Sequence, residues 1–177
     1  EVCDVQVIHA DAVRTARAVT EFRTVRRLSG SSHLLPLMVD CERALGRPDR
    51  ALDLAASPEA RTLEPAERVE LAIVVSGIRL DAGDAAGAAA GLETLALSAA
   101  ATRPWSARLR YAYAEAKLAL GDEAAAREWF ARAADADAEL ATDAAERLEE
   151  LDGVAYVDLL ADDEDTDDPA GTDITKA

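Results

Sequence analysis

Histidine and cysteine are the residues of this chain best suited to bind a metal ion or to act as a nucleophile. The histidines are His9 and His33, and neither stands at metal-ligand spacing from a carboxylate or a thiol. The cysteines, Cys3 and Cys41, indicate neither a disulfide framework nor a zinc cluster. We therefore expect no metal and no cofactor, and the cysteine usage points to a cytoplasmic protein.

Acidic residues near the C-terminus come closest to a metal-binding motif. Asp163, Asp165 and Asp167 have the spacing of the first ligands of an EF-hand calcium loop. Asp168 stands where that loop needs Gly, and Ile174 stands where it needs Glu. We therefore interpret residues 153–177 as an acidic disordered tail, because such a composition buries too little apolar surface to order itself.

Glycines also fail to form a catalytic or phosphate-binding motif. The sequence has no P-loop and no dinucleotide-binding loop. Gly87 and Gly91 form a small-x3-small pattern, which we attribute to close helix packing rather than to membrane dimerisation. Without a nucleophile, base or phosphate cradle in a recognisable arrangement, we expect that the protein is not an enzyme.

The formal net charge of −16 disfavours nucleic acid as a partner, because nucleic-acid binding depends on Lys and Arg. No basic region followed by an apolar stretch opens the chain, and no apolar run approaches the roughly 18 residues of a membrane span. Half of the residues are hydrophobic but only 4% are aromatic, with alanine dominant. This composition predicts helices packed through small side chains.

A repeat organises these helices. Gly46, Gly83 and Gly121 lie 37 and 38 residues apart, a spacing typical of stacked helical repeats. We expect each Gly to end one helix with a positive φ, and Asp84 and Asp122 to cap the next. A small residue and a second apolar residue then follow one helical turn apart; these pairs are Ala51 and Ala55, Ala88 and Leu92, and Ala126 and Phe130.

This pattern resembles the tetratricopeptide repeat (TPR) family, here in a bacterial, actinobacterial-type form. The best match covers residues 107–139, where Ala114, Gly121, Ala126, Phe130 and Ala133 fit the family's pattern. The match departs from it at Arg110 and Ala138, where the family prefers Trp and Pro. The resemblance implies an all-α, right-handed α-solenoid of antiparallel helix hairpins over residues 11–152.

The expected elements are a leading half repeat, three hairpins and a capping helix. The half repeat is a helix over 11–28, preceded by an N-terminal segment, 1–10, that is a truncated or disordered end. The hairpins pair 33–45 with 48–56, 65–81 with 84–97, and 104–120 with 122–137. A capping helix begins at Asp143, with Glu146 forming a capping box, and ends near Gly153. Residues 57–65 are a linker.

In the resembled family, the first helices of the hairpins line a concave groove that binds proteins or peptides. The resemblance places eight residues on that groove: Asp40, Arg43, Ile73, Leu80, Arg108, Tyr111, Glu115 and Leu118. Chaperone-binding members of the family hold a carboxylate with cationic and Asn side chains. Here the corresponding positions carry Pro36, Asp40, Val74, Arg108 and Ala112, and only Arg108 fits. The expected function is a scaffold for an unidentified protein or peptide.

Two alternatives remain open. A half repeat at the N-terminus would leave an apolar edge that a second copy could cover, giving a homo-oligomer. The first helix also carries five cations against Glu21, and these could contact an anion or nucleic acid under regulation by the acidic tail; the cations are Arg14, Arg17, Arg23, Arg26 and Arg27. Pairing of these arginines with nearby carboxylates would be the simpler explanation.

Overall fold

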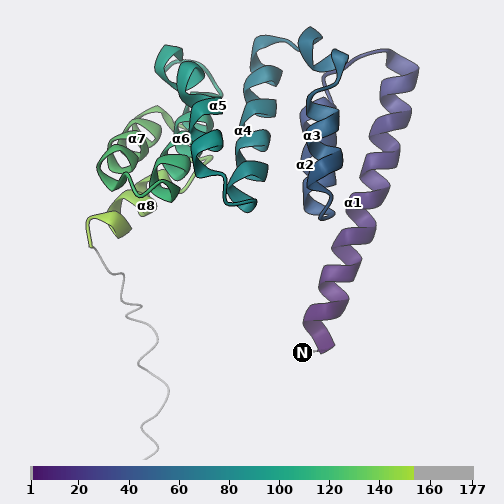
Figure 1. The fold of residues 1–177 in the computed structure, drawn as a ribbon, viewed down its shortest axis with the longest axis horizontal. Coiled ribbons are helices and arrows are strands. Elements are labelled where there is room, and N and C mark those ends of the chain that lie inside the picture. Colours follow the sequence, from purple (N-terminus) through teal and green to yellow (C-terminus); the bar gives the residue numbers. More distant parts are fainter. Residues whose placement is uncertain (1, 154–177) are drawn as a thin grey trace, which may run out of the picture.

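The computed structural model describes the backbone of residues 2–153, and the side chains of that range except those of residues 2–13, 26 and 29. All regular structure in this range is helical, and the helices follow one another along the molecule (Figure 1). The elements are α1 (Val2–Ser29), α2 (Leu35–Ala44), α3 (Pro48–Ala55), the 3-10 helix η1 (Pro58–Thr62), α4 (Pro65–Asp81), α5 (Ala85–Ser98), α6 (Ser106–Ala119), α7 (Glu123–Ala136) and α8 (Ala144–Leu151).

The glycine turns have the predicted conformation. Gly46, Gly83 and Gly121 take φ values of 68°, 78° and 78°, which side chains other than Gly rarely adopt. Asp84 accepts a hydrogen bond from the Gly87 amide at 2.8 Å, so it caps α5 as expected. Asp122 caps α7 in the same way, through the Ala125 amide at 3.3 Å. The turn chemistry therefore fixes where each hairpin folds back.

Small residues occupy equivalent buried positions in the second helices of the hairpins. Ala51, Ala88 and Ala126 are each 0% exposed, as are Leu92 and Phe130 one turn further along. Because the alanine side chains are small, the paired helices can approach closely, and a larger side chain at these positions would prevent this. The predicted pairing of a small with a larger residue is confirmed for α5 and α7, whereas Ala55 in α3 is half-buried.

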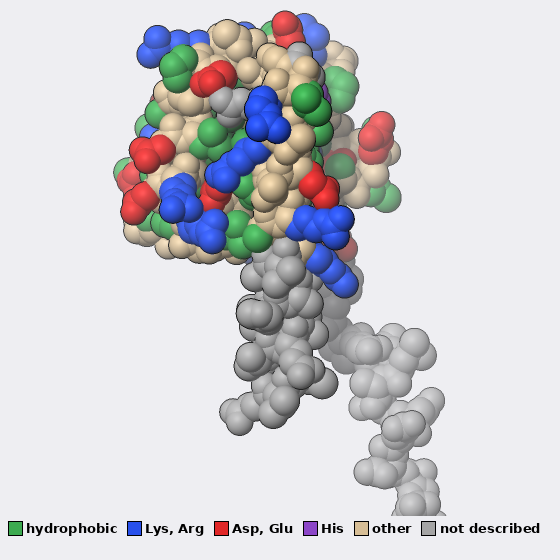
Figure 2. All heavy atoms as spheres, turned by 90° about the vertical axis from the view of Figure 1, so that its right-hand side faces the viewer, with side chains coloured by type: hydrophobic (Ala, Val, Ile, Leu, Met, Phe, Trp, Pro, Cys, Tyr) green, Lys and Arg blue, Asp and Glu red, His purple; other side chains and the backbone are tan. Residues whose placement is uncertain are grey.

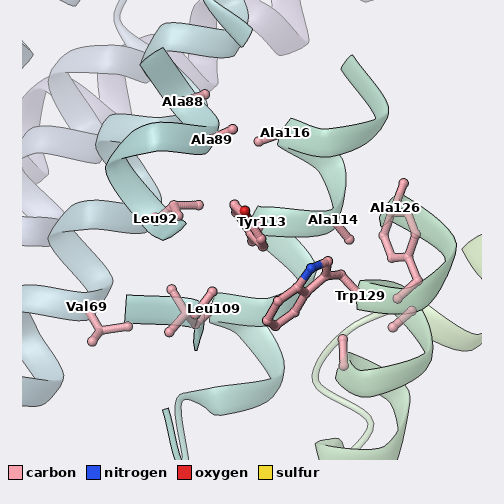
Figure 3. Packing of buried hydrophobic residues seen from close by; sticks show 14 residues of the cluster. Val69, Ala88, Ala89, Leu92, Leu109, Tyr113, Ala114, Ala116, Ala126 and Trp129 are labelled. Carbon is pink, nitrogen blue, oxygen red and sulfur yellow. The ribbon is translucent and has the colours of Figure 1, made fainter. Parts of the chain in front are cut away.

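Two core clusters meet at α4. The larger cluster runs from α4 to α8 and includes Leu109, Trp129 and Phe130, and Figure 3 shows its side chains interdigitating between α5, α6 and α7. Trp129 meets the ring of Tyr113 edge-on, with centroids 4.9 Å apart. The smaller cluster joins α2, α3 and η1 to the other side of α4. α4 therefore couples the two halves of the described fold.

Consecutive helices pack against each other throughout, and α4 also packs against both α2 and α6. The first helices of the three hairpins thus lie next to one another and form one surface. We call the surface of α2, α4 and α6 the inner face. The second helices, α3, α5 and α7, lie beyond it.

α1 is longer than predicted. The helix begins at Val2 rather than at residue 11, so the segment expected to precede it is part of the helix. Residues 1–10 contain neither Gly nor Pro, and nothing in their sequence ends a helix. α1 packs on α2 through buried Val19, and Arg23 pairs at 2.9 Å with the carboxylate of Glu42, which is buried in α2. Its first turns extend past α2 in Figure 1.

The linker forms a short helix that was not predicted, and the capping helix packs on the core more than predicted. Residues 58–62 form η1, and the following Leu63 is buried at 4% exposure. Asp143 stands at the N-cap of α8 but makes no capping hydrogen bond there, so the predicted capping box is wrong. α8 is not mainly solvent-facing, since Ala144 is buried and Leu148 and Leu151 pack on the larger core cluster.

The acidic tail predicted for residues 153–177, with its aspartates, lies outside the described residues from 154 onward. Within residues 2–153, no helix is long and apolar enough to cross a membrane.

Candidate functional site

Six of the eight residues assigned to the groove line one hollow on the inner face. This hollow, of about 380 Å³, we call the central hollow. The six are Arg43 from α2, Ile73 and Leu80 from α4, and Arg108, Tyr111 and Glu115 from α6. Asp40 lines a neighbouring hollow, described below. Leu118 lines neither and packs against the larger core cluster instead.

Apolar groups from α4 and α6 line much of the central hollow. Ile73 and Leu80 are partly exposed there, and Ala112 lies in the same wall. Their spacing along α4 and α6 places them on the side that faces the neighbouring first helices. A hollow with such walls can take an aliphatic side chain.

Arg43 reaches into the central hollow because Gly77 leaves room for it. A Cβ atom on Gly77 would lie 2.8 Å from Arg43 Nη1, closer than real Cβ contacts. The guanidinium then bonds Asp81 at the end of α4, with Arg43 Nε 2.7 Å from the carboxylate. This hydrogen bond raises the pKa of Arg43 above its ordinary value, although partial burial opposes the shift. The sequence pattern does not indicate Gly77, because its role depends on a neighbouring helix.

Tyr111 forms a wall of the hollow and is also part of the core. Its ring meets Phe130 edge-on with centroids 5.4 Å apart. Burial, followed by a hydrogen bond to Asp143, raises the pKa of the Tyr111 hydroxyl well above its ordinary value. The phenol is therefore neutral at physiological pH.

Glu115 is held by Arg147 of α8. Arg147 Nε lies 3.0 Å from a Glu115 carboxylate oxygen, and both side chains are about one-third exposed or less. Hydrogen bonds to Glu115 and to Glu150 raise the pKa of Arg147, against the effect of burial. Arg147 also lies over the Phe130 ring, 5.7 Å from its centroid. Glu115 is therefore a fixed and largely neutralised part of the wall.

Asp137 organises the loop that closes the central hollow at its α7–α8 end. Its carboxylate accepts hydrogen bonds from the Ala141 and Thr142 amides at 2.8 and 2.7 Å and from the Thr142 hydroxyl at 2.6 Å. These bonds, that of the Thr142 side chain first, lower the pKa of Asp137. Ala141 and Thr142 line the hollow. The sequence pattern indicates none of these three residues, because the loop conformation brings Ala141 and Thr142 to the Asp137 carboxylate.

The neighbouring hollow, of about 350 Å³, lies between α2, α4 and α6, and we call it the acidic hollow. Its charged lining residues are Asp40, Glu67, Glu70 and Arg108, and Arg108 belongs to both hollows. Arg108 pairs with Glu70 at 2.9 Å. The carboxylate-clamp positions Pro36, Asp40, Val74 and Arg108 gather here, and the one matching cation among them is already bonded within the chain.

Ser76 adds an unsatisfied polar group to the wall of the central hollow. The residue is 3% exposed, and its hydroxyl oxygen has no hydrogen-bond partner. Ser76 also borders a smaller hollow between α4 and α5. An unpaired buried hydroxyl is costly, since most buried polar groups in proteins are bonded.

The described residues contain no group of three or more His, Cys, Asp or Glu side chains that could hold a metal ion. Cys41 is a free cysteine whose pKa is raised by burial and then by the charges of Asp40 and Glu42. A raised pKa keeps the thiol protonated and weakens it as a nucleophile. The chemistry of the inner face is thus hydrogen bonding, charge pairing and apolar contact.

Comparisons with family models, with curated proteins and with solved structures found no match for this chain.

Proposed function

We propose that the chain is a TPR-like, right-handed α-solenoid. Three features of the described residues support this proposal. The hairpins turn at equivalent glycines with positive φ, the second helices bury equivalent alanines, and the first helices pack side by side. In such an array each hairpin covers the apolar face of its neighbour, so the first helices form a continuous surface.

We further propose that this protein is a non-enzymatic scaffold that binds a protein or peptide on its inner face. The observation that carries the proposal is the gathering of six predicted groove residues around one hollow of about 380 Å³. The residues come from three helices that are up to 72 positions apart in the sequence, from Arg43 to Glu115. Their combination of aliphatic walls and paired charges suits an extended peptide. Pockets that accept alternate side chains of such a peptide provide its specificity.

The side chains of α1 give less support to the two alternative functions, which are homo-oligomerisation and contact with an anion or nucleic acid. Its described outward positions carry mostly polar residues, including Arg17, Glu21 and Thr24, which resembles a solvated cap more than an apolar edge awaiting a second copy. Figure 2 shows cationic side chains interspersed with acidic ones on this end of the molecule. Among the arginines of α1, Arg17 pairs with Glu21 and Arg23 pairs with Glu42. This pairing weakens the case for anion binding.

The proposal can be tested by filling the central hollow. Ala112→Trp would place an indole in the hollow, and Ala124→Trp would place one at an exposed position of α7 as a matched control. Partners captured from a lysate and identified by mass spectrometry should be recovered with the wild type and the control but lost with Ala112→Trp. Melting temperatures would establish that both variants fold. Equal recovery with all three proteins would refute binding at the inner face.

Tyr111→Ala is a poor test of binding, because this ring also packs on Phe130. The change would lower stability as well as alter the hollow. Arg108→Ala is better suited, since the Arg108 side chain is 51% exposed and its pair with Glu70 lies at the surface. Arg108→Ala should change the affinity for the partner while the melting temperature stays near that of the wild type.

A further inference from the structure

The acidic hollow carries more negative than positive charge. Three carboxylates, those of Asp40, Glu67 and Glu70, face one guanidinium, that of Arg108. Arg108 is engaged by Glu70 at 2.9 Å. Asp40 is 55% exposed, and the cation paired with it is Arg43 at 3.7 Å, a long contact. Asp40 is thus a carboxylate whose charge is weakly compensated and open to a ligand.

Apolar groups surround these carboxylates. Leu37 is 52% exposed, and Val74 and Pro36 lie in the same lining. A Lys or Arg side chain has an apolar stem and a charged end, and so matches this combination. The stem would lie along Leu37 and Val74, and the charged end would reach Asp40.

The central hollow differs from the acidic hollow, because its charged side chains are paired with other residues of the chain. Arg43 bonds Asp81, Arg108 bonds Glu70 and Glu115 bonds Arg147. What remains for a ligand is the aliphatic surface of α4 and α6. An aliphatic side chain fits this surface.

We infer that the inner face selects an extended peptide with a Lys or Arg side chain in the acidic hollow and an aliphatic side chain in the central hollow. The two hollows adjoin at Arg108. Alternate side chains of an extended chain point to the same side at a spacing of roughly 6.4–6.8 Å, which suits neighbouring pockets. This inference rests on the proposed peptide-binding function of the inner face.

Other occupants fit the charges less well. An acidic C-terminal peptide needs a free cation, and Arg108 is held by Glu70. Residues 154–177 of this chain carry eight Asp and Glu residues against Lys176, so they have the same sign as the acidic hollow. That excess would instead attract a cationic partner and raise its association rate at low salt.

The inference can be tested by selecting from a displayed library of random peptides of about twelve residues, long enough to span both hollows when extended. The full chain would be compared with the double variant Asp40→Asn/Glu70→Gln. A control, Asp49→Asn/Glu93→Gln, makes the same change of charge at exposed positions of α3 and α5. The strongest selected peptide would then be synthesised, with a second version carrying citrulline in place of its Arg.

We expect the selection to enrich sequences with Arg or Lys and an aliphatic residue two positions away. The acidic-hollow variant should bind the chosen peptide about three- to tenfold more weakly, as should the wild type with the citrulline peptide. The control should bind as the wild type does. These differences should shrink as salt concentration rises.

Two results would overturn the inference, and only one of them would also refute peptide binding at the inner face. If acidic or purely aliphatic peptides are enriched and Ala112→Trp abolishes their binding, the basic-peptide preference is wrong while the inner face remains a binding site. If binding is unaffected by Ala112→Trp, or if nothing is enriched, both the preference and the proposed function are wrong.

Discussion

Replacing Ala126 with leucine should destabilise the protein, because this alanine allows α7 to lie close to its neighbours. Ala126 and Phe130, one turn later, are both 0% exposed. The added carbons would meet packed side chains rather than solvent, and overpacking of this kind costs about 1–3 kcal/mol. For a chain of this size, that loss corresponds to a fall in melting temperature of roughly 2–12 °C.

The matched control is Ala124→Leu, at an exposed position of the same helix. It changes the same atoms and the same helix propensity, so its effect on the free energy of unfolding should stay within about 0.5 kcal/mol. Thermal and urea unfolding followed by circular dichroism would measure both variants. Ala88→Leu should behave like Ala126→Leu, because Ala88 is equally buried. The repeat account would fail if the buried and exposed substitutions had the same effect.

Three further predictions concern the described fold. Asp137→Ala should lower the free energy of unfolding by about 1–3 kcal/mol and weaken inner-face binding, since it frees Ala141 and Thr142; unchanged binding would show that their loop has no part in the site. The pKa of Asp137 is lower in the folded than in the unfolded chain. The ionised carboxylate therefore stabilises the folded state above the unfolded pKa near 3.9, and this stabilisation is lost as pH falls through the folded pKa. Wild-type stability should therefore fall more than that of Asp137→Asn below about pH 4, and parallel curves would contradict this. Arg23→Ala should cost about 1–3 kcal/mol by leaving buried Glu42 with only the 3.4 Å contact to Arg47, whereas Arg17→Ala, at an exposed pair, should stay within about 0.5 kcal/mol in the same urea titration.

Much of the fold could be predicted because its determinants are local. A Gly with positive φ followed by an Asp cap specifies a turn within a few residues, and this is why the α4–α5 and α6–α7 turns were predicted within about one residue. The buried alanines were also predictable, since their four-residue spacing to a larger residue places both on one helix face. The start of α1 was not, because residues 1–10 contain no helix-ending signal.

Part of the site could be predicted, because helical spacing gives the face on which a residue lies but not its contacts with other helices or loops. Helical spacing placed Ile73 and Leu80 on one side of α4, and the structure brings them to the same hollow. The contribution of Gly77 depends on Arg43 reaching across from α2, and that of Asp137 depends on a loop conformation. Leu118 packs against the larger core cluster, and a single helix pattern cannot distinguish such a position from one on the groove.

The account's central claim is that a peptide binds on the inner face of α2, α4 and α6. The most direct measurement is the amide chemical shifts of the isotope-labelled full chain, recorded while the strongest display-selected peptide is titrated in. We expect the largest shifts at the residues that line the central and acidic hollows, with Ala112→Trp suppressing them. Shifts confined to α1 or to α3, α5 and α7 would contradict the claim.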